Sequence, residues 1–384
     1  MTEIHIFDIA AWCEFIGSGS GLSFDHGYHL FLNDEEIKDL VIPDGVTKIG
    51  KCAFRSFTYL TSVTIPGSVT SLDEGAFSRC SGLTSVIMHE GLTSIGKYAF
   101  DYCSSLTSIT IPSSVESIGQ YAFDGCTGLT SLIIGCVNIP DRAFQNCKSL
   151  TSLTIEEGVK SIGECAFDHC EGLTSVTIPN SVKSIGEYVF RYCEGLTSVT
   201  IPNSVTEMAQ TAFWYCNLTT PLYNDTYFFF HDGYIQGACV IPEGIQYIQR
   251  MAFSDSKYMT SVTIPASVVT IGDRAFLKCH FDDMYCYVKT PIGANNLFEM
   301  TDLSNSTLHV PAASLEAYKT TEPWSQFGNI VALTDEEMAI GNITIEKTDV
   351  KDIFDLGGSR TNQLKQGLNI IRTKDGKTMK VWVK

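Results

Sequence analysis

Residues 106–123 read LTSITIPSSVESIGQYAF, and this stretch decides the fold. In an extended chain, successive side chains point to opposite faces. The spacing of Leu106, Ile109 and Ile111 therefore aims three apolar side chains at one side, while the hydroxyl side chains between them point outward. The pattern predicts a short strand with one face on a core and the other in solvent.

The remainder of the stretch completes one coil. Pro112 ends the strand because proline cannot donate a ladder hydrogen bond, and the serines after it suit a turn. Val115 and Ile118 predict a second short extended piece on the core. We expect residues 121–123 to form a helical turn in which Phe123 fills the interior.

The same phrase recurs along the chain. Most steps between copies are 23 residues, one is 21 and one is 40, and this period is typical of leucine-rich repeats. One coil cannot bury its apolar face alone, so the coils must stack and their strands must form a parallel sheet. The sequence therefore predicts a leucine-rich repeat solenoid, α/β and strand-rich, with short strands and helical turns in each coil. The Ala-Phe (once Val-Phe) pairs that mark the repeat are Ala53-Phe54, Ala76-Phe77, Ala99-Phe100, Ala122-Phe123, Ala143-Phe144, Ala166-Phe167, Val189-Phe190, Ala212-Phe213, Ala252-Phe253 and Ala275-Phe276.

This repeated phrase resembles the BspA-like leucine-rich repeat family of bacterial surface proteins, notably those of the Bacteroidetes. The resemblance covers about residues 37–333, and residues 308–331 resemble the terminal coil of such proteins. It implies a non-enzymatic adhesin, on the cell surface or secreted, that binds host or bacterial proteins. The first residues contain no basic region followed by an apolar run, so no signal peptide is expected in this numbering.

The repeat pattern divides the chain into five parts. Residues 1–36 should cap the first coil, residues 37–216 hold regular repeats, and residues 217–242 form an irregular coil. Residues 243–333 carry a second run of repeats and the terminal coil. Residues 334–384 contain strand-like runs between glycine turns and predict a small antiparallel β segment.

The N-terminal part should cover the apolar edge of the first coil. Trp12 and Phe15 are the side chains that we expect to do this. Residues 17–21 read GSGSG and predict a flexible loop.

The irregular coil contains an aromatic run, Tyr227-Phe228-Phe229-Phe230. One interpretation is a strand packed over an irregular core. The alternative is a protruding aromatic patch that contacts a partner. On the second interpretation, Tyr227, Phe228 and Phe229 are candidate binding residues.

Composition limits the partners. Acidic residues outnumber basic ones by 43 to 26, which gives a formal net charge of -17. Such a chain repels phosphate backbones and anionic lipid, so nucleic-acid binding and membrane binding are not expected. No stretch approaches the roughly 20 apolar residues of a membrane span. We expect a monomer whose partners are proteins.

Fourteen cysteines invite a disulfide or metal interpretation, but eight of them stand three residues after the repeat phenylalanine. A fixed repeat slot predicts a ladder with one cysteine per coil. Disulfides are the alternative, although parallel side-chain directions spoil their geometry, and zinc needs converging ligands. We expect buried free thiols that act as small apolar side chains. The eight are Cys80, Cys103, Cys126, Cys147, Cys170, Cys193, Cys216 and Cys279.

Enzyme signatures are absent from the sequence. It contains no HExxH motif, no phosphate-binding glycine loop and no dinucleotide fingerprint. We therefore expect no catalytic residues, no metal site and no cofactor.

The outward sheet face should carry a ladder of short hydroxyl side chains, and binding specificity should lie where the ladder is broken. The deviating positions are Met88, His89, Ile133, Gly135 and Glu156. The ladder itself comprises Ser62, Thr64, Ser85, Ser108, Thr110, Ser131, Ser152, Thr154, Ser175, Thr177, Ser198, Thr200, Ser261 and Thr263.

Two functions from different classes follow. The chain is either a binder of proteins, with glycan binding as a variant, or a structural spacer without a dedicated ligand. A conspicuous aromatic or apolar patch on one face favours the binder, and a uniform Ser/Thr surface favours the spacer.

Overall fold

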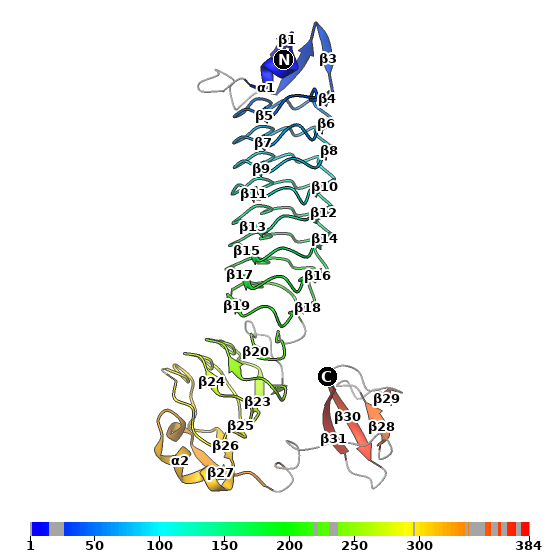
Figure 1. The fold of residues 1–384 in the computed structure, drawn as a ribbon. Coiled ribbons are helices and arrows are strands. Elements are labelled where there is room, and N and C mark those ends of the chain that lie inside the picture. Colours follow the sequence, from blue (N-terminus) through cyan, green and yellow to red (C-terminus); the bar gives the residue numbers. More distant parts are fainter. Residues whose placement is uncertain are drawn as a thin grey trace. The chain divides into compact units, whose positions relative to one another are not determined.

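The computed structural model describes most of the repeats and parts of both ends (Figure 1). The chain divides into two compact units, residues 1–224 with 229–231, and residues 225–228 with 232–384. The described residues are 2–14, 27–209, 211–218, 222–229, 237–294, 296–334, 337, 350–354, 360–361, 367–373 and 378–383.

The first unit begins with a small sheet and one short helix. β1 (Thr2–Ile6) pairs in parallel with β2 (Tyr28–Leu32), and β2 pairs antiparallel with β3 (Glu35–Ile37). Asp8 caps α1 (Ile9–Cys13) by accepting hydrogen bonds from two backbone N–H groups. The Trp12 indole of this helix donates to the carbonyl of Ala53, 2.7 Å away, in the first Ala-Phe pair. Phe15 and the loop expected at 17–21 lie outside the described residues.

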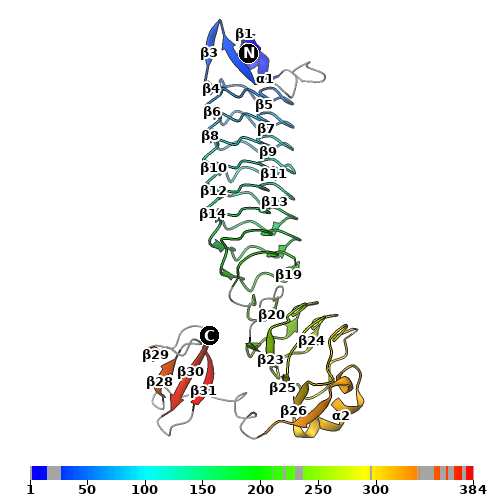
Figure 2. The same ribbon diagram turned by 180° about the vertical axis from the view of Figure 1, so that it is seen from behind.

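The repeats of this unit form stacked coils with parallel strands (Figures 1 and 2), as the sequence predicts. The first six coils contribute a strand of three or four residues to one series, which the last two coils continue with two residues each, and every coil contributes a two-residue strand to a second series. The longer strands are β4 (Asp39–Val41), β6 (Ser62–Ile65), β8 (Ser85–Met88), β10 (Ser108–Ile111), β12 (Ser131–Ile134) and β14 (Ser152–Ile155), followed by the pair β16 (Val176–Thr177) and β18 (Val199–Thr200). The shorter strands are β5 (Lys48–Ile49), β7 (Ser71–Leu72), β9 (Ser94–Ile95) and β11 (Ser117–Ile118), and then β13 (Asn138–Ile139), β15 (Ser161–Ile162), β17 (Ser184–Ile185) and β19 (Glu207–Met208).

The Ala-Phe segment of each coil is a hydrogen-bonded turn, and the helical turn expected at residues 121–123 is wrong. Tyr121 has a φ of 61°, in the left-handed region, which interrupts any right-handed helix. Phe123 N–H donates to the carbonyl of Ala143 in the next coil at 2.8 Å. Bonds between coils replace the bonds within a helix that the sequence pattern suggested.

The repeat phenylalanines form one continuous stack in the core of the first unit. From Phe54 to Phe213, successive ring centroids lie 5.0–5.5 Å apart and the rings are nearly parallel. All of these rings are essentially buried. Burying a phenylalanine contributes about 1.5–3 kcal/mol, so this column is a large part of what holds the coils together.

The cysteine ladder lies beside the phenylalanine stack. The fourteen cysteines are free thiols, and all but Cys52 are buried, so the prediction of buried free thiols is confirmed. Each ladder thiol donates to the backbone carbonyl of the phenylalanine in the preceding coil, over 2.9–3.5 Å. Most of these carbonyls also accept a backbone N–H, as Phe100 does from Cys103 at 3.3 Å, so the thiol supplies their second hydrogen bond.

The second unit repeats this architecture with fewer coils and closes it with helices. Its aromatic column includes Phe253 and Phe276, whose ring centroids are 4.8 Å apart. Tyr318 and Trp324 are fully buried at the last coil. The strands are β20 (Tyr227–Phe228), β22 (Tyr247–Ile248) and β24 (Thr270–Ile271) in one sheet, and β21 (Gly237–Val240), β23 (Met259–Ile264), β25 (Asp283–Cys286), β26 (Thr307–Val310) and β27 (Asn329–Ala332) in the other. The helices are η1 (Ala312–Ser314), α2 (Leu315–Thr320) and η2 (Trp324–Gln326).

Four further strands lie near the C-terminus, and they pair antiparallel in the order β29-β28-β30-β31. They are β28 (Val350–Phe354), β29 (Arg360–Thr361), β30 (Gly367–Thr373) and β31 (Thr378–Val383).

The ladder cysteines should not react with alkylating agents in the native protein. Burial raises the pKa of the Cys80 thiol to about 12, and the thiolate is the form that reacts with alkylating agents. Iodoacetamide at pH 8 should therefore modify Cys52 first, and the ladder thiols only after unfolding in guanidinium. Mass spectrometry of native and unfolded samples checks this. Rapid native labelling of several ladder positions, or a mass deficit from linked cysteines, would contradict the buried free thiols.

Candidate binding surface

One candidate surface is the outer face of the sheet from β4 to β14. Side chains on this face stand in rows because the strands pair in register. The first row begins with Asp39 and continues with the serines that the sequence predicts, from Ser62 to Ser152. The second row alternates Val or Ile with Thr, and Val41 and Ile87 are 61% and 51% exposed. This row comprises Val41, Thr64, Ile87, Thr110, Ile133 and Thr154.

The predicted deviations on this sheet do not form one site. Met88 is half-buried at the end of β8, and His89 after it is exposed. Ile133 is half-buried on β12, and the exposed Glu156 follows the neighbouring strand β14. A Cβ atom at Gly135 would lie 2.7 Å from the Glu156 Oε2 atom, so the end of the Glu156 side chain would have to move. The sheet row also contains Ile87, a deviation that sequence reasoning missed.

The aromatic run of the irregular coil is packed inward, so the interpretation of Phe228 and Phe229 as a protruding contact patch is wrong. Phe228 is 0% exposed and Phe229 is 2% exposed. Phe228 stacks on Phe253 with ring centroids 5.1 Å apart, because it continues the core column of the second unit. Tyr227 is half-buried and stacks on Tyr247 at 5.1 Å. Phe230 lies outside the described residues.

A second candidate surface is formed by the Ala-Phe turns, and we call it the turn face. It consists of three positions in each repeat: the residue before the Ala-Phe or Val-Phe pair and the two residues after the pair. Tyrosines recur directly before the pair and at the second residue after it. Tyr98 stacks on Tyr121 with centroids 5.2 Å apart, and Tyr192 stacks on Tyr215 at 4.6 Å. The tyrosines recur at fixed slots of the repeat and are visible in the sequence, so they are the signal from which this surface could be predicted.

The densest aromatic cluster on the turn face lies at the last regular coils of the first unit. We call Tyr188, Arg191, Tyr192, Trp214 and Tyr215 the aromatic patch. The rings of Tyr188 and Trp214 are 5.7 Å apart, and those of Trp214 and Tyr215 are 5.5 Å apart. Tyr215 is 49% exposed, and the other members are partly exposed. The patch therefore presents large aromatic side chains to solvent on a rigid stack of coils.

Basic side chains of the turn face lie over the tyrosine rings. The Arg191 guanidinium is 4.7 Å from the ring centroid of Tyr188 and 5.6 Å from that of Tyr192. Arg79 lies 5.1 Å from the ring of Tyr102. At such distances a cation is attracted to the electron-rich face of an aromatic ring. At these positions of the turn face, a cationic side chain therefore packs against an aromatic ring.

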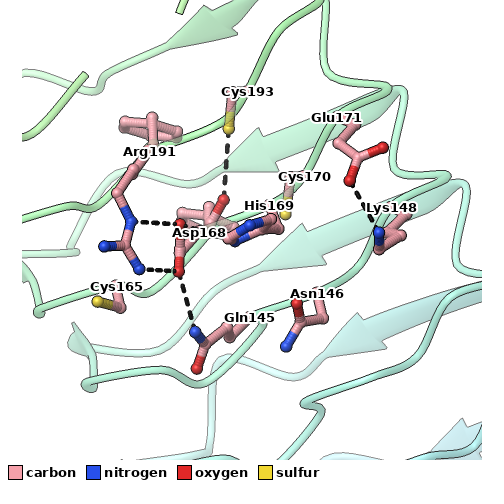
Figure 3. Close-up of polar contacts among 12 residues, drawn as sticks. Gln145, Asn146, Lys148, Cys165, Asp168, His169, Cys170, Glu171, Arg191 and Cys193 are labelled. Carbon is pink, nitrogen blue, oxygen red and sulfur yellow. Dashed lines mark hydrogen bonds and ion pairs between the residues drawn. The ribbon is translucent and has the colours of Figure 1, made fainter. Parts of the chain in front are cut away.

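A buried carboxylate fixes Arg191 in the patch (Figure 3). Asp168 is 0% exposed and accepts two hydrogen bonds from Arg191, at 2.9 and 2.7 Å. Gln145 donates to the same carboxylate at 2.9 Å. A paired geometry of this kind orients the guanidinium and neutralises its charge.

Asp101 occupies the same repeat slot as Asp168 but lacks such a partner. It is 7% exposed, and its Oδ1 atom has no hydrogen-bond partner within the described parts of the chain. Burial raises the pKa of this carboxyl, although a hydrogen bond from Ser78 and the charges of Arg55 and Arg79 act against the shift. Within this slot, Asp168 is therefore well paired and Asp101 is poorly paired.

No metal site or membrane-spanning helix is found in the described ranges. No group of three or more His, Cys, Asp and Glu side chains there is arranged to hold a metal ion. None of the helices in the same ranges is long and apolar enough to cross a membrane.

The repeats match a known family. Residues 26–139, 134–235 and 225–320 match the BspA type leucine rich repeat region, in six copies. The chain belongs to this family. The resemblance read from the sequence is confirmed, and the BspA-type repeats account for both candidate surfaces.

Solved structures similar to these BspA-type repeats come from several bacteria. A leucine rich cell surface protein from Faecalibacterium prausnitzii A2-165 is 24% identical, over 80% of this chain and 92% of its own, with a TM-score of 0.42. A leucine-rich repeat protein from Bacteroides ovatus ATCC 8483 is 19% identical, over 76% of this chain and 80% of its own, with a TM-score of 0.47. The pneumococcal vaccine antigen PcpA is 15% identical, over 80% and 87%, with a TM-score of 0.32. No curated protein matches the chain.

Replacing Asp101 in the BspA-type repeats should stabilise the protein. Because the pKa of this carboxyl is raised in the folded state, the folded protein binds its proton more tightly than the unfolded chain. The charged form therefore costs stability above the folded pKa, and this cost vanishes as the pH falls below the ordinary value of 3.8. Asp101→Asn should raise the unfolding free energy at pH 7 by about 1 kcal/mol, and the gain should shrink toward pH 4. Urea unfolding at several pH values measures this. The exposed Asp44→Asn is the control, and an unstable Asp101→Asn at pH 7 would contradict the assignment.

Replacing Asp168 should have the opposite effect. Asp168→Asn leaves the partly buried Arg191 guanidinium without its counter-charge, which should cost about 2 kcal/mol. The same urea experiment at pH 7 compares the two variants, which change the same slot by the same chemical step. Equal changes in unfolding free energy for the two variants would show that the hydrogen bonds to Asp168 do not stabilise the fold.

Proposed function

We propose that this BspA-type repeat protein binds protein partners through the turn face and acts as a surface-exposed or secreted adhesin without enzymatic activity. The observation that carries the proposal is the aromatic patch. Tyrosine, tryptophan and arginine are the residues that contribute most to binding energy at protein interfaces. Here they form one cluster on a rigid scaffold, so little ordering is needed when a partner binds.

The sheet face is a weaker candidate for partner binding than the turn face. Its serine row and its alternating Thr and Val or Ile row are flat and weakly charged, which is what a spacer would present. Met88, His89, Ile133 and Glu156 are scattered over several coils, so we assign them to a secondary surface at most. The aromatic patch favours the binder over the spacer, because a spacer has no need of exposed aromatic side chains.

Glycan binding fits the patch less well than protein binding. Sugars pack on the open faces of aromatic rings, but Tyr192 lies between His169 and Tyr215, at 4.5 and 4.6 Å between ring centroids. Both of its faces are therefore covered. Ring edges and hydroxyl groups remain available, and these suit contacts with polypeptide.

The proposed location at the cell surface or outside the cell rests on family membership. BspA-like repeats are typical of bacterial surface proteins, and the net charge of -17 suits a protein that must stay soluble among other surfaces.

Binding to immobilised extracellular-matrix proteins and bacterial surface extracts tests the proposal. The full chain should bind at least one of them saturably at micromolar concentration. The double variant Tyr192→Ser/Tyr215→Ser should weaken that binding about tenfold or more, whereas Ser108→Ala/Thr110→Ala on the sheet face should not. Circular dichroism and thermal unfolding establish that both variants are folded. Absence of any saturable partner, or equal binding by the two variants, would count against the turn face as the binding surface.

A further inference from the structure

The turn-face tyrosines of the first unit differ in one respect, the presence of a cation over the ring. Lys97 lies 4.9 Å from the ring of Tyr98 and 5.9 Å from that of Tyr121, and Arg142 lies 5.8 Å from Tyr121. Tyr102, Tyr188 and Tyr192 have the arginines already described. Within the described residues, Tyr215 and its neighbour Trp214 have no basic side chain over their rings.

We infer that Trp214 and Tyr215 accept an arginine or lysine side chain from a basic segment of a partner protein. The inference rests on the proposed function and names the chemistry of the partner. On the turn face of the first unit, the chain itself places a guanidinium or ammonium group over all the tyrosine rings except that of Tyr215. A partner's cation would complete the pattern at the last aromatic pair, where Tyr215 is 49% exposed.

The charges around the patch favour a cation. Arg191 is the nearest basic group, and its charge is compensated by the two hydrogen bonds to buried Asp168. Glu187 precedes Tyr188 in the chain and Glu194 follows Tyr192 by two residues; both are exposed. Neither glutamate forms an ion pair with another described residue. The patch therefore combines partly exposed aromatic rings with exposed glutamates that have no ion-pair partner among the described residues, which is complementary to a basic segment.

A side-chain hydrogen bond ties one of these glutamates, Glu194, to the segment that follows the aromatic pair. Asn217, two residues after Tyr215, donates from Nδ2 to the carbonyl of Glu194 at 2.6 Å. A long basic side chain lying on Tyr215 can then direct its charge toward the Glu194 carboxylate, as arginine does when it stacks on a ring and pairs with an acid.

Two synthetic peptides test the inference on the full chain. The first is a fluorescein-labelled 12-residue peptide of four Arg-Ser-Gly units, and the second carries citrulline in place of each arginine. Citrulline keeps the shape of the guanidinium but not its charge. Fluorescence anisotropy should show saturable binding of the arginine peptide and at least about tenfold weaker binding of the citrulline peptide.

The decisive comparison is between two tyrosines in the same repeat slot. Tyr215 and Tyr102 are each 49% exposed, but Arg79 already lies over Tyr102. Tyr215→Ala and Trp214→Ala should each weaken binding of the arginine peptide about fivefold or more. Tyr215→Phe, which keeps the ring, and Tyr102→Ala should leave it unchanged. Thermal unfolding of each variant confirms that the fold is retained.

The outcomes separate this inference from the proposed function. If Tyr215→Ala and Tyr102→Ala bind the arginine peptide equally, the peptide is held only by the overall negative charge and the inference is wrong. If the protein partners found above still depend on Tyr192 and Tyr215, the proposed function stands without it. If neither the peptides nor the protein partners depend on the patch, both are wrong.

Discussion

In-register stacking of the coils is the constraint on which the rest of the structure depends. The phenylalanine rings repeat at 5.0–5.5 Å. All the remaining positions of the repeat must therefore recur at the same spacing. Each side chain then lies above a near copy of itself, and the slot must suit that arrangement. Phenylalanine, cysteine and serine do so easily. Carboxylates do not, because like charges repel at this distance, and Asp168 is relieved by Arg191 and Gln145 from adjacent coils.

Much of this could be predicted from the sequence because the core obeys simple rules. Alternation placed Ile109 and Ile111 inside, and the fixed slot of Cys126 identified a ladder of thiols. The turn at Tyr121 could not be predicted, because a left-handed conformation is normally signalled by glycine or asparagine. Here bonds between coils, such as that from Phe123 to Ala143, hold tyrosine, arginine and histidine in a conformation that they rarely adopt alone.

The candidate site was harder to predict than the fold, for a physical reason. The period identifies which residues are buried, but it says little about side chains that point outward. Phe228 looked unusual in the sequence, yet it continues a core column and is buried against Phe253. Trp214 and Tyr215 looked like part of an ordinary repeat, yet they lie together on the surface with Tyr188 and Tyr192. Their importance depends on stacking between coils, which no single repeat reveals.

The uniform coil also governs how such a chain can change length in evolution. Because most coils make the same contacts above and below, removing or duplicating a segment of 23 residues rejoins two equivalent surfaces. An unequal exchange between neighbouring repeats in a gene would therefore yield a folded product that keeps the phenylalanine stack. Each such event between β3 and the patch would move the aromatic patch by one coil relative to the N-terminal sheet, about 5 Å, and leave its internal geometry intact. The length of the repeat stack and the structure of the aromatic patch can thus evolve separately in this architecture.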